Sequence, residues 1–454
     1  MFDPAIPYEP ISPEKWLELV ELHSDEELKQ IIQGQHPADL ANLLDQLTSD
    51  HQLHLFELLE TDVIPEVLSQ LDQHLQFRIL SHQSDENIAE IIDEMDSDDA
   101  ADVLGAFDDE RTQAVLNNLE DDSRIELTEL LEYDVESAGG IMAKEAAAAP
   151  ENATVSEVIE ILRELGTDID DIYNVYLFDE NEKLTGTISL KTLILAKPGV
   201  KVKTLMNTDI VSVNVNMDQE EVASLISRYD LASLPVVDND GKFLGRITHD
   251  DILDVLADEA HEDFARLTGQ SEFDPGDRSL FRNLRNRLPW LILGLCGGLG
   301  AATLLSYFEP QLAHLTTLIF FLPLVPAMGG NAGIQTSSLM VRGLATGEIV
   351  EYGTVLRIFR EFAISLLAGI ACAILIFAVV MIWQDDFPLA LVVSLALLVV
   401  IVLAASIGVI IPLILKKFGL DPALATGPFI TASNDILGLF IYLGIATMML
   451  SLHS

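Results

Sequence analysis

Apolar residues recur at twelve-residue intervals between residues 31 and 131. Within each set they follow the spacing i, i+1, i+4, which is the spacing of one face of an α-helix. The pattern predicts a stack of short helices, two in each hairpin of ~24 residues, that winds into a superhelical solenoid. One predicted core position from each of four sets is Leu43, Leu68, Ile92 and Leu116. Between the sets lie candidate helix N-caps, namely Ser49-Asp50, Thr61-Asp62, Ser84-Asp85, Ser97-Asp98 and Asp108-Asp109.

The pattern changes after residue 140, where strand-like runs alternate with helical runs up to residue 263. We expect strands at 174–178 and 234–238, and helices at 156–165 and 219–229. Two segments, YLFDENEKLTGTISLKTLI and PVVDNDGKFLGRITHDDIL, match each other when Gly186 is aligned with Gly245, which also pairs Asp179 with Asp238. This duplication of a β-turn-β-helix unit is similar to a tandem pair of CBS modules. Such a pair is typical of ligand-sensing domains.

Five long apolar stretches follow, at about 288–308, 315–342, 362–384, 387–415 and 423–452, and each is long enough to cross a membrane as a helix. Basic residues lie before the first stretch and after the second and fourth, whereas the other two connections carry only acidic charges. We therefore expect a multi-pass protein of the cell (inner) membrane, with cytoplasmic N-terminal domains and an outside C-terminus. An odd number of spans excludes a simple inverted repeat within one chain and favours a transport path between subunits.

The charge is divided between the same two parts of the chain. The 454 residues include 25 Lys and Arg against 72 Asp and Glu, a net charge of −47, and yet 49% are hydrophobic. The first 288 residues carry −44 of this charge and the rest only −3. A body this acidic repels the phosphates of nucleic acids and attracts cations. Cys296 and Cys372 both lie in apolar stretches, which excludes a disulfide scaffold, and MFDPAIPYEP has neither the basic nor the apolar region of a signal peptide.

Acidic side chains are densest in the helix expected over 249–264, HDDILDVLADEAHEDF. Like charges one turn apart destabilise a helix by about 0.2–0.5 kcal/mol per pair. No Lys or Arg lies between Arg246 and Arg266, so a divalent cation is the expected counter-charge. Oxygen ligands, without Cys and with only isolated His, favour a hard ion such as Mg²⁺ over Zn²⁺. The carboxylates of this helix are Asp250, Asp251, Asp254, Asp258, Glu259, Glu262 and Asp263.

Two of the spans contain polar residues that a lipid-facing helix does not favour. The second has PLVPAMGGNAGIQTSS at 323–338. Its small residues could serve close helix packing, but the amides and hydroxyls from Asn331 onward indicate contact with water. The fifth carries Asn434 and Asp435, and no Lys or Arg lies deep in any expected span. An intramembrane carboxylate of this kind marks an ion path, a proton relay or a counter-ion.

The whole chain resembles the MgtE family of magnesium channels. The resemblance rests on the order of an acidic helical N-domain, two CBS modules, a connecting helix and five spans, and on GGNAGIQ at 329–335 and DP…NDILG from Asp421 to Gly438. It implies an all-α superhelical N-domain at 1–137, an α/β tandem CBS pair at 138–263, an amphipathic connecting (plug) helix at 264–287 and an all-α five-helix transmembrane domain at 288–454. It also implies a Mg²⁺-selective uptake channel that cytosolic Mg²⁺ closes, built as a homodimer with one pore.

The same resemblance assigns site residues. Asp435 corresponds to the central selectivity residue of the pore, and the other residues expected to bind the ion in the pore are Asn434, Asn331, Gly330 and Asp421. Regulatory Mg²⁺ ions are expected to bridge the N-domain to the CBS pair and the CBS pair to the connecting helix. The positions expected to bind them, together with Asp250 of the acidic helix, are Asp98, Asp102, Asp218, Glu220, Asp230, Asp251, Asp254, Glu259, Glu262 and Asp263. The chain departs from some relatives at Gly427, where an Asn can stand, and at Ile334, in place of a second Asn.

Several alternatives stay open. A transporter or channel for Co²⁺ or Mn²⁺ would use the same oxygen ligands. An intramembrane enzyme is not expected, because HEDF at 261–264 lacks a second histidine and no other catalytic set is visible. An anion transporter would need basic sites, and Asp435 argues against it. ATP binding at the CBS pair is undecided, since no phosphate-cradling loop is visible. The expected partners are a second copy of the chain, the lipid bilayer and divalent cations, but not nucleic acid.

Overall fold

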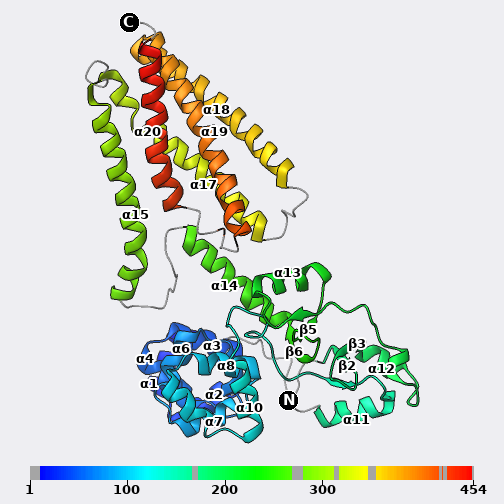
Figure 1. Cartoon of the computed structure of the whole chain (residues 1–454). Coiled ribbons are helices and arrows are strands. Elements are labelled where there is room, and N and C mark those ends of the chain that lie inside the picture. Colours follow the sequence, from blue (N-terminus) through cyan, green and yellow to red (C-terminus); the bar gives the residue numbers. More distant parts are fainter. Residues whose placement is uncertain are drawn as a thin grey trace, which may run out of the picture. The chain divides into compact units, whose positions relative to one another are not determined.

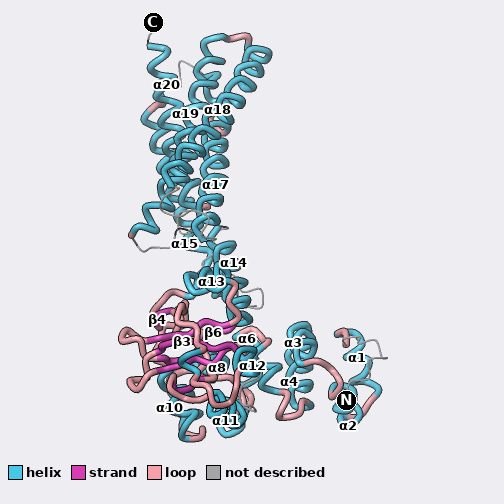
Figure 2. The backbone as a smooth tube through the Cα atoms, turned by 90° about the vertical axis from the view of Figure 1, so that its right-hand side faces the viewer, coloured by secondary structure: helices cyan, strands magenta, loops and turns pink. Residues whose placement is uncertain are grey.

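The computed structural model describes residues 11–165, 172–267, 280–310, 316–345, 354–418, 422 and 427–451. The chain divides into two compact units, residues 1–255 and 256–454, which are described separately. Figure 1 labels their elements, and Figure 2 colours helices and strands.

The first unit opens with short helices whose N-caps follow the predicted twelve-residue period. The helices are α1 (Pro13–Leu22), α2 (Asp25–Ile32), α3 (Pro37–Gln46), α4 (Ser49–Leu58), α5 (Ile64–Ser69), α6 (Gln73–Leu80), α7 (Asp85–Ile92), α8 (Ser97–Gly105), α9 (Asp109–Leu116) and α10 (Asp121–Leu130). Apart from α5, the caps from α2 onward are Ser24, His36, Thr48, Asp72, Ser84, Asp96, Asp108 and Glu120.

The predicted caps are correct in part. The side chains of Ser84 and Asp108 accept hydrogen bonds from the backbone N–H groups of Asn87 and Arg111, at 3.2 and 2.9 Å. Ser49 and Ser97 are wrong by one residue, because α4 and α8 begin with these residues and the caps precede them. Thr61 and Asp62 are also wrong: α5 is capped by Val63, since Pro65 in the first turn favours a helix start just before it.

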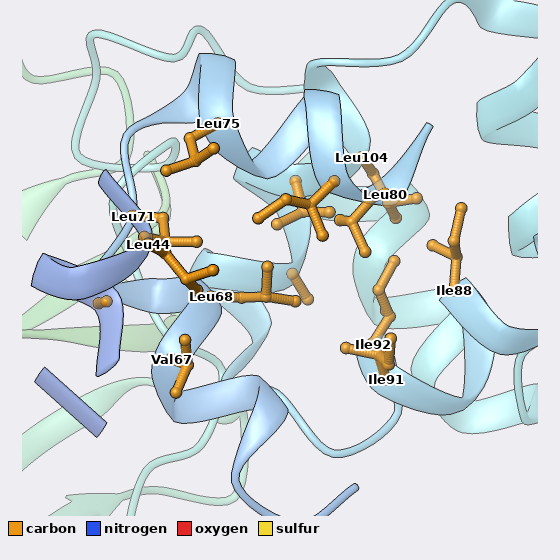
Figure 3. Close-up of a cluster of buried hydrophobic side chains, with 14 of the residues drawn as sticks. Leu44, Val67, Leu68, Leu71, Leu75, Leu80, Ile88, Ile91, Ile92 and Leu104 are labelled. Carbon is orange, nitrogen blue, oxygen red and sulfur yellow. The ribbon is translucent and has the colours of Figure 1, made fainter. Parts of the chain in front are cut away.

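The solenoid core lies where the register predicts it. From α2 onward, helices two apart in the sequence pack together, as in α3 with α5 and α7 with α9. Leu43, Leu68, Ile92 and Leu116 are each at most 3% exposed, which confirms the four predicted core positions. Figure 3 shows the interior of this domain, where Leu68 and Ile92 come from different helices of the stack.

Buried amides repeat with the period of the hairpin. The side-chain amide of Gln52 donates to the carbonyl of Leu44 at 2.9 Å, and that of Gln76 donates to Leu68 at 2.8 Å. The two glutamines stand 24 residues apart, so each hairpin uses the same device to satisfy a buried carbonyl.

The CBS pair consists of two three-stranded sheets, drawn in magenta in Figure 2. The first contains β1 (Ala148–Pro150), β2 (Asn174–Phe178) and β3 (Leu184–Ser189), and the second β4 (Val213–Asn214), β5 (Ser233–Val237) and β6 (Phe243–Thr248). In both sheets the first two strands are parallel and the last two antiparallel. Their helices are α11 (Val155–Leu165), α12 (Leu190–Leu195), η1 (Val202–Thr204), α13 (Gln219–Tyr229) and α14 (His249–Leu267).

The predicted duplication is confirmed at the level of single hydrogen bonds. Asp179 accepts from the backbone N–H groups of Asn181 and Lys183, at 2.8 and 3.0 Å. Its counterpart Asp238 accepts from residues 240 and 242, both at 2.8 Å. The same side chain therefore shapes the same hairpin turn in both modules.

Among its described residues, the second unit has five segments of suitable length and composition to cross a membrane, as the hydropathy pattern predicts. They belong to α15 (Leu280–Tyr307), to η2 (Thr316–Phe321) with α17 (Leu324–Ala345), and to α18 (Thr354–Gln384), α19 (Phe387–Lys417) and α20 (Pro428–Ser451). The third span starts at Leu356 rather than 362, because the turn that carries Arg357 and Arg360 is already helical. The expected connecting helix at 264–287 stays a prediction, since residues 268–279 lie outside the described residues.

Glycines let the spans approach closely. A Cβ atom built on Gly408 of α19 would lie 2.6 Å from the carbonyl oxygen of Gly333 in α17, and one on Gly297 of α15 would lie 2.6 Å from the Cβ of Ala432 in α20. The α17–α19 and α15–α20 crossings therefore exclude any larger residue at these positions.

Candidate functional site

The first candidate site is an acidic cluster between the solenoid and the CBS pair, within the first unit. Asp98 and Asp99 lie in the first turn of α8, and Asp251 lies in the first turn of α14. Asp98 and Asp99 are half-buried, so their charges are partly removed from water. The sequence predicted Asp98 and Asp251 but missed Asp99, because only the fold brings α8 to α14.

The electrostatics of the cluster favour a cation. Burial raises the pKa of Asp98 well above its ordinary value, and the neighbouring carboxylates of Asp251 and Asp99 raise it further. Burial raises the pKa of Asp99 to about 7, and the carboxylates of Asp96 and then Asp251 make the next largest contributions. Asp102 and Asp254 add to the same effect on Asp99. Carboxylates crowded in this way release protons only with difficulty unless a cation offsets their charge.

Asp251 is oriented by the start of its own helix. Its carboxylate accepts hydrogen bonds from the backbone N–H of Thr248 at 2.9 Å and from the Thr248 hydroxyl at 2.7 Å. Burial raises the pKa of Asp251, although these two hydrogen bonds from Thr248 oppose the effect. The carboxylate is thus held at the N-terminus of α14 in a fixed direction.

Hydrogen bonds and one ion pair tie the start of α8, next to the cluster, to neighbouring parts of the chain. The Ser97 hydroxyl donates to the Glu145 carboxylate at 2.8 Å and accepts from the backbone N–H of Lys144, also at 2.8 Å. Lys144, in turn, lies 2.9 Å from the Glu129 carboxylate on α10. These contacts join α8 and α10 to the segment that enters the CBS pair.

The other predicted regulatory positions are divided into separate groups. Asp218 caps α13 and Glu220 lies in its first turn, whereas Asp230 follows its last residue. An eleven-residue helix is about 16 Å long, so one ion cannot contact both ends within one chain.

The predicted positions on α14 differ in their exposure. Asp250 and Asp254 are exposed, and Glu259 and Glu262 are half-buried. The side chain of Asp263 lies outside the described residues. No three His, Cys, Asp or Glu side chains in the described part are arranged to hold a metal ion.

The second candidate site lies where α17 meets α20 in the membrane unit. Asp435 is half-buried on α20, and Asn331 and Gln335 are exposed on one face of α17. Gly330 is buried, yet a Cβ atom built on it would meet no atom within 4 Å. Asp421 lies outside the described residues. Asn434 is 3% exposed, and its amide nitrogen donates to the carbonyl oxygen of Gly329 at 3.4 Å.

One charged pair in this unit was missed by the sequence reasoning. Glu361 of α18 is 7% exposed, and its carboxylate lies 3.5 Å from the guanidinium Nε of Arg357, one turn earlier. The expected third span began after both residues, so they were assigned to a connection between spans. Their adjacency in an i, i+4 pair is the signal that could have extended the helix.

Known proteins resemble the chain over nearly its full length. It is 35% identical to the magnesium transporter MgtE of Bacillus subtilis, over 93% of both chains. It is also 35% identical to the magnesium transporter MgtE of Thermus thermophilus, over 93% of this chain and 95% of the relative. A solved structure of the cytosolic domain of the Mg²⁺ channel MgtE in complex with ATP has a TM-score of 0.51 and 36% identity, and covers 54% of this chain and 99% of that domain.

The fold defines a multi-pass membrane protein that carries a helical-repeat domain and a tandem CBS pair before its spans. Family models match each part: the MgtE intracellular N domain at residues 35–136, CBS domains at 138–199 and 202–258, and the MgtE divalent cation transporter at 322–445. The chain belongs to the MgtE family. This is a family of transporters and not of enzymes.

Proposed function

We propose that this protein is a Mg²⁺-selective channel for the uptake of magnesium. We propose further that Mg²⁺ in the cytosol closes this channel. The observation that carries the proposal is the half-buried carboxylate of Asp435 in the apolar span α20, which packs against α17. The relatives named magnesium transporters support the choice of ion. Mg²⁺ gives up its water reluctantly, so a carboxylate with amides and carbonyls can attract a largely hydrated ion without trapping it.

The pore is proposed to form between two copies of the chain. Asn331 and Gln335 stand one turn apart on the exposed face of α17. Amides facing hydrocarbon are unfavourable, whereas amides facing a second subunit or water are not. A two-fold axis beside this face would bring two Asp435 carboxylates toward one ion, and their mutual repulsion would favour a cation between them.

Regulation is assigned to the acidic cluster of α8 and α14. Without a cation, the charges of Asp98, Asp99 and Asp251 oppose the contact between these helices, as their raised pKa values indicate. Because the described side chains form no group of three that could hold a metal ion directly, Mg²⁺ is proposed to reach these carboxylates through water molecules of its hydration shell. Since the ion binds the compact form better, it shifts the equilibrium toward that form and closes the channel. The exposed carboxylates of α13 and the half-buried Glu259 and Glu262 of α14 are proposed to hold further ions.

The orientation follows from charge at the two ends of the spans. Gly329 of α17 meets Val400 of α19, and Gly333 meets Gly408, so the contacts advance along both helices together and the helices run in the same direction. Arg342 near the end of α17 and Lys416 and Lys417 at the end of α19 therefore lie at one level. Asp385 and Asp386 lie between α18 and α19 at the opposite level. Since basic ends stay on the cytoplasmic side, this distribution of charge supports a cytoplasmic placement of the N-terminal domains.

A second ligand is proposed for the CBS pair. The cytosolic domain of the similar Mg²⁺ channel was solved in complex with ATP. Titration calorimetry of the purified chain with ATP, with and without Mg²⁺, tests whether this protein shares that property. No heat of binding in either condition would remove ATP from its ligands.

Asp435→Asn tests the channel proposal, because it keeps the shape of the side chain and removes its charge. In proteoliposomes loaded with a Mg²⁺-sensitive dye, we expect wild-type flux to fall at least tenfold in this variant. Asp385→Asn is the matched control, since Asp385 is exposed between α18 and α19 and an asparagine tolerates its positive φ of 49°. Parallel assays with Mn²⁺ and Co²⁺ decide between a magnesium channel and a general divalent one. Wild-type flux through Asp435→Asn would move the ion path elsewhere.

A further inference from the structure

The second span is not one continuous helix. It begins as the 3₁₀-helix η2 (Thr316–Phe321), turns at Leu322 and Pro323, and continues as α17 from Leu324. Irregular backbone at membrane depth persists only where its freed polar groups find partners in protein or water. The break therefore needs groups from neighbouring helices.

Three positions on one face of α20 dock against the broken segment. Asn434, Gly438 and Tyr442 are spaced i, i+4, i+8, so they lie on successive turns. Asn434 donates to the carbonyl oxygen of Gly329, after the break. A Cβ atom on Gly438 would lie 3.3 Å from the Cα atom of Pro326. The Tyr442 hydroxyl, on a fully buried side chain, donates to the carbonyl oxygen of Leu318 in η2 at 3.0 Å.

An aromatic ring from another span also contacts η2. Trp383 of α18 lies with its ring centroid 5.9 Å from that of Phe320 and 6.0 Å from that of Phe321. Phe321 is 4% exposed and Leu318 is 3% exposed. The 3₁₀-helix is thus fixed by a hydrogen bond from α20 and by aromatic contacts from α18.

This arrangement ties the break to the proposed ion-binding carboxylate. Tyr442 follows Asp435 by seven residues, which on an α-helix is about two turns and nearly the same direction. Asn434 is the residue directly before Asp435. Any movement of η2 or of the start of α17 relative to Tyr442 and Asn434 would therefore move the backbone of the second span relative to Asp435.

We infer that Tyr442 and Asn434 are positioning residues: they clamp the broken second span at Leu318 and Gly329 and so set the width and selectivity of the ion path at Asp435. The inference rests on the proposed channel function and deepens it. It gives Asn434 a role through the Gly329 carbonyl rather than as an ion ligand. It also makes the hydroxyl of Tyr442, a group remote from the signature motifs, part of what selects the ion.

Tyr442→Phe is the direct test, because it removes one hydroxyl and keeps the ring. Full-length protein in proteoliposomes should show Mg²⁺ flux, per folded molecule, reduced about three- to tenfold, the range expected for one interhelical hydrogen bond. The ratio of Mg²⁺ to Mn²⁺ flux should fall as well, which loss of stability alone would not cause. Tyr307→Phe is the matched control, since Tyr307 is 78% exposed on α15, and it should leave both quantities unchanged.

An optical readout reports the position of η2 without any ion flux. The chain has three tryptophans, so replacing Trp16 and Trp290 by Phe leaves Trp383 as the single reporter beside Phe320 and Phe321. In that background Tyr442→Phe should shift or quench the Trp383 emission, and Tyr307→Phe should not. Should Tyr442→Phe not fold, Trp383→Phe in the otherwise natural chain loosens the same helix from the other side and should lower the same flux ratio.

The outcomes separate this inference from the channel proposal. If Asp435→Asn loses flux while Tyr442→Phe keeps the wild-type flux, flux ratio and Trp383 emission, the clamp is refuted and the channel stands. If Tyr442→Phe loses thermal stability but keeps the flux ratio per folded molecule, Tyr442 is only structural and the inference also fails. If Asp435→Asn carries Mg²⁺ as the wild type does, the channel proposal itself fails, whatever Tyr442→Phe does.

Discussion

Asp99 offers a direct test of whether the cluster between α8 and α14 responds to cations. Its pKa is raised from 3.8 to about 7, first by burial and then by the carboxylates of Asp96 and Asp251. The folded protein therefore keeps a proton that the unfolded chain has already released above pH 4. By linkage, the stability of this region is highest at low pH and falls as the pH rises toward 7.

The size of the effect follows from the same two values. A shift of one pKa unit corresponds to about 1.36 kcal/mol. The shift of the Asp99 pKa from 3.8 to about 7 therefore corresponds to a loss of about 4 kcal/mol in the free energy of unfolding. Asp99 is half-buried rather than fully enclosed, and solvent screens part of the repulsion, so we expect about 2–4 kcal/mol. A bound divalent cation should restore most of this loss, because it offsets the charges that oppose the contact.

Hydrogen exchange of the full-length protein, followed by mass spectrometry, measures the local stability of α8 and of the start of α14. Peptides from α8 and from the start of α14 should lose protection between pH 5 and pH 8 in EDTA, after correction for intrinsic exchange, and regain it in Mg²⁺. Asp99→Asn removes one charge, so without Mg²⁺ it should be more protected than the wild type at pH 8 and similar to it at pH 5. The gain from Mg²⁺ should be smaller in this variant.

Asp50→Asn is the control for this experiment. Asp50 is exposed in the first turn of α4, at the repeat position that corresponds to Asp98, but α4 lies in an earlier hairpin. It should change neither the pH dependence nor the response to Mg²⁺ of the α8 and α14 peptides. Equal protection of wild-type α8 at pH 5 and pH 8 in EDTA, or a response to Mg²⁺ that Asp99→Asn leaves intact, would refute the reasoning.

Three further predictions address the scaffold. Leu68→Ala should destabilise the solenoid by about 2–5 kcal/mol in chemical unfolding, whereas Leu22→Ala, at a position 77% exposed, should cost little; equal effects would contradict the repeat register. Gly408→Ala should disrupt the α17–α19 crossing and lower the melting temperature in detergent, because its Cβ would meet the Gly333 carbonyl; Gly294→Ala, which would meet nothing within 4 Å, should not. In a cysteine-free background, a cysteine at Asp386 should react with an impermeant thiol reagent from outside and one at Lys417 only from inside; the reverse would overturn the orientation.

The parts of the structure that local patterns specify were predictable. The twelve-residue register gave the core positions of the solenoid, because each helix buries the same face against the helix two further on. Hydropathy gave the five spans, since a span must be apolar whatever it packs against. The duplicated turns at Asp179 and Asp238 were predictable for a similar reason: the hydrogen bonds that build them join residues only two to four apart.

Features that depend on contacts between residues far apart in the sequence were not predictable. From the sequence, Asp99 is indistinguishable from an exposed acidic residue. Nothing in the first turn of α8 indicates that the start of α14, some 150 residues later in the chain, lies beside it. The hydrogen bond from Tyr442 to Leu318 joins residues 124 apart, and a tyrosine in a span is ordinary by itself. Glu361 was misassigned for a simpler reason, since a window of apolar residues ends at the first charge even where the helix continues.

The motif around Asp435 shows why adjacency in sequence is a poor guide to shared function inside a helix. Asn434 and Asp435 stand side by side in the chain, and the sequence predicted both as ion ligands. On an α-helix, however, neighbouring side chains point about 100° apart. The structure has Asn434 buried against Gly329 and Asp435 half-buried beside it. Asn434 therefore contacts the helix that must be held in place, and Asp435 keeps part of its carboxylate accessible for the proposed path. A span that positions its own ion site needs both directions, and a two-residue motif is the shortest sequence that supplies them.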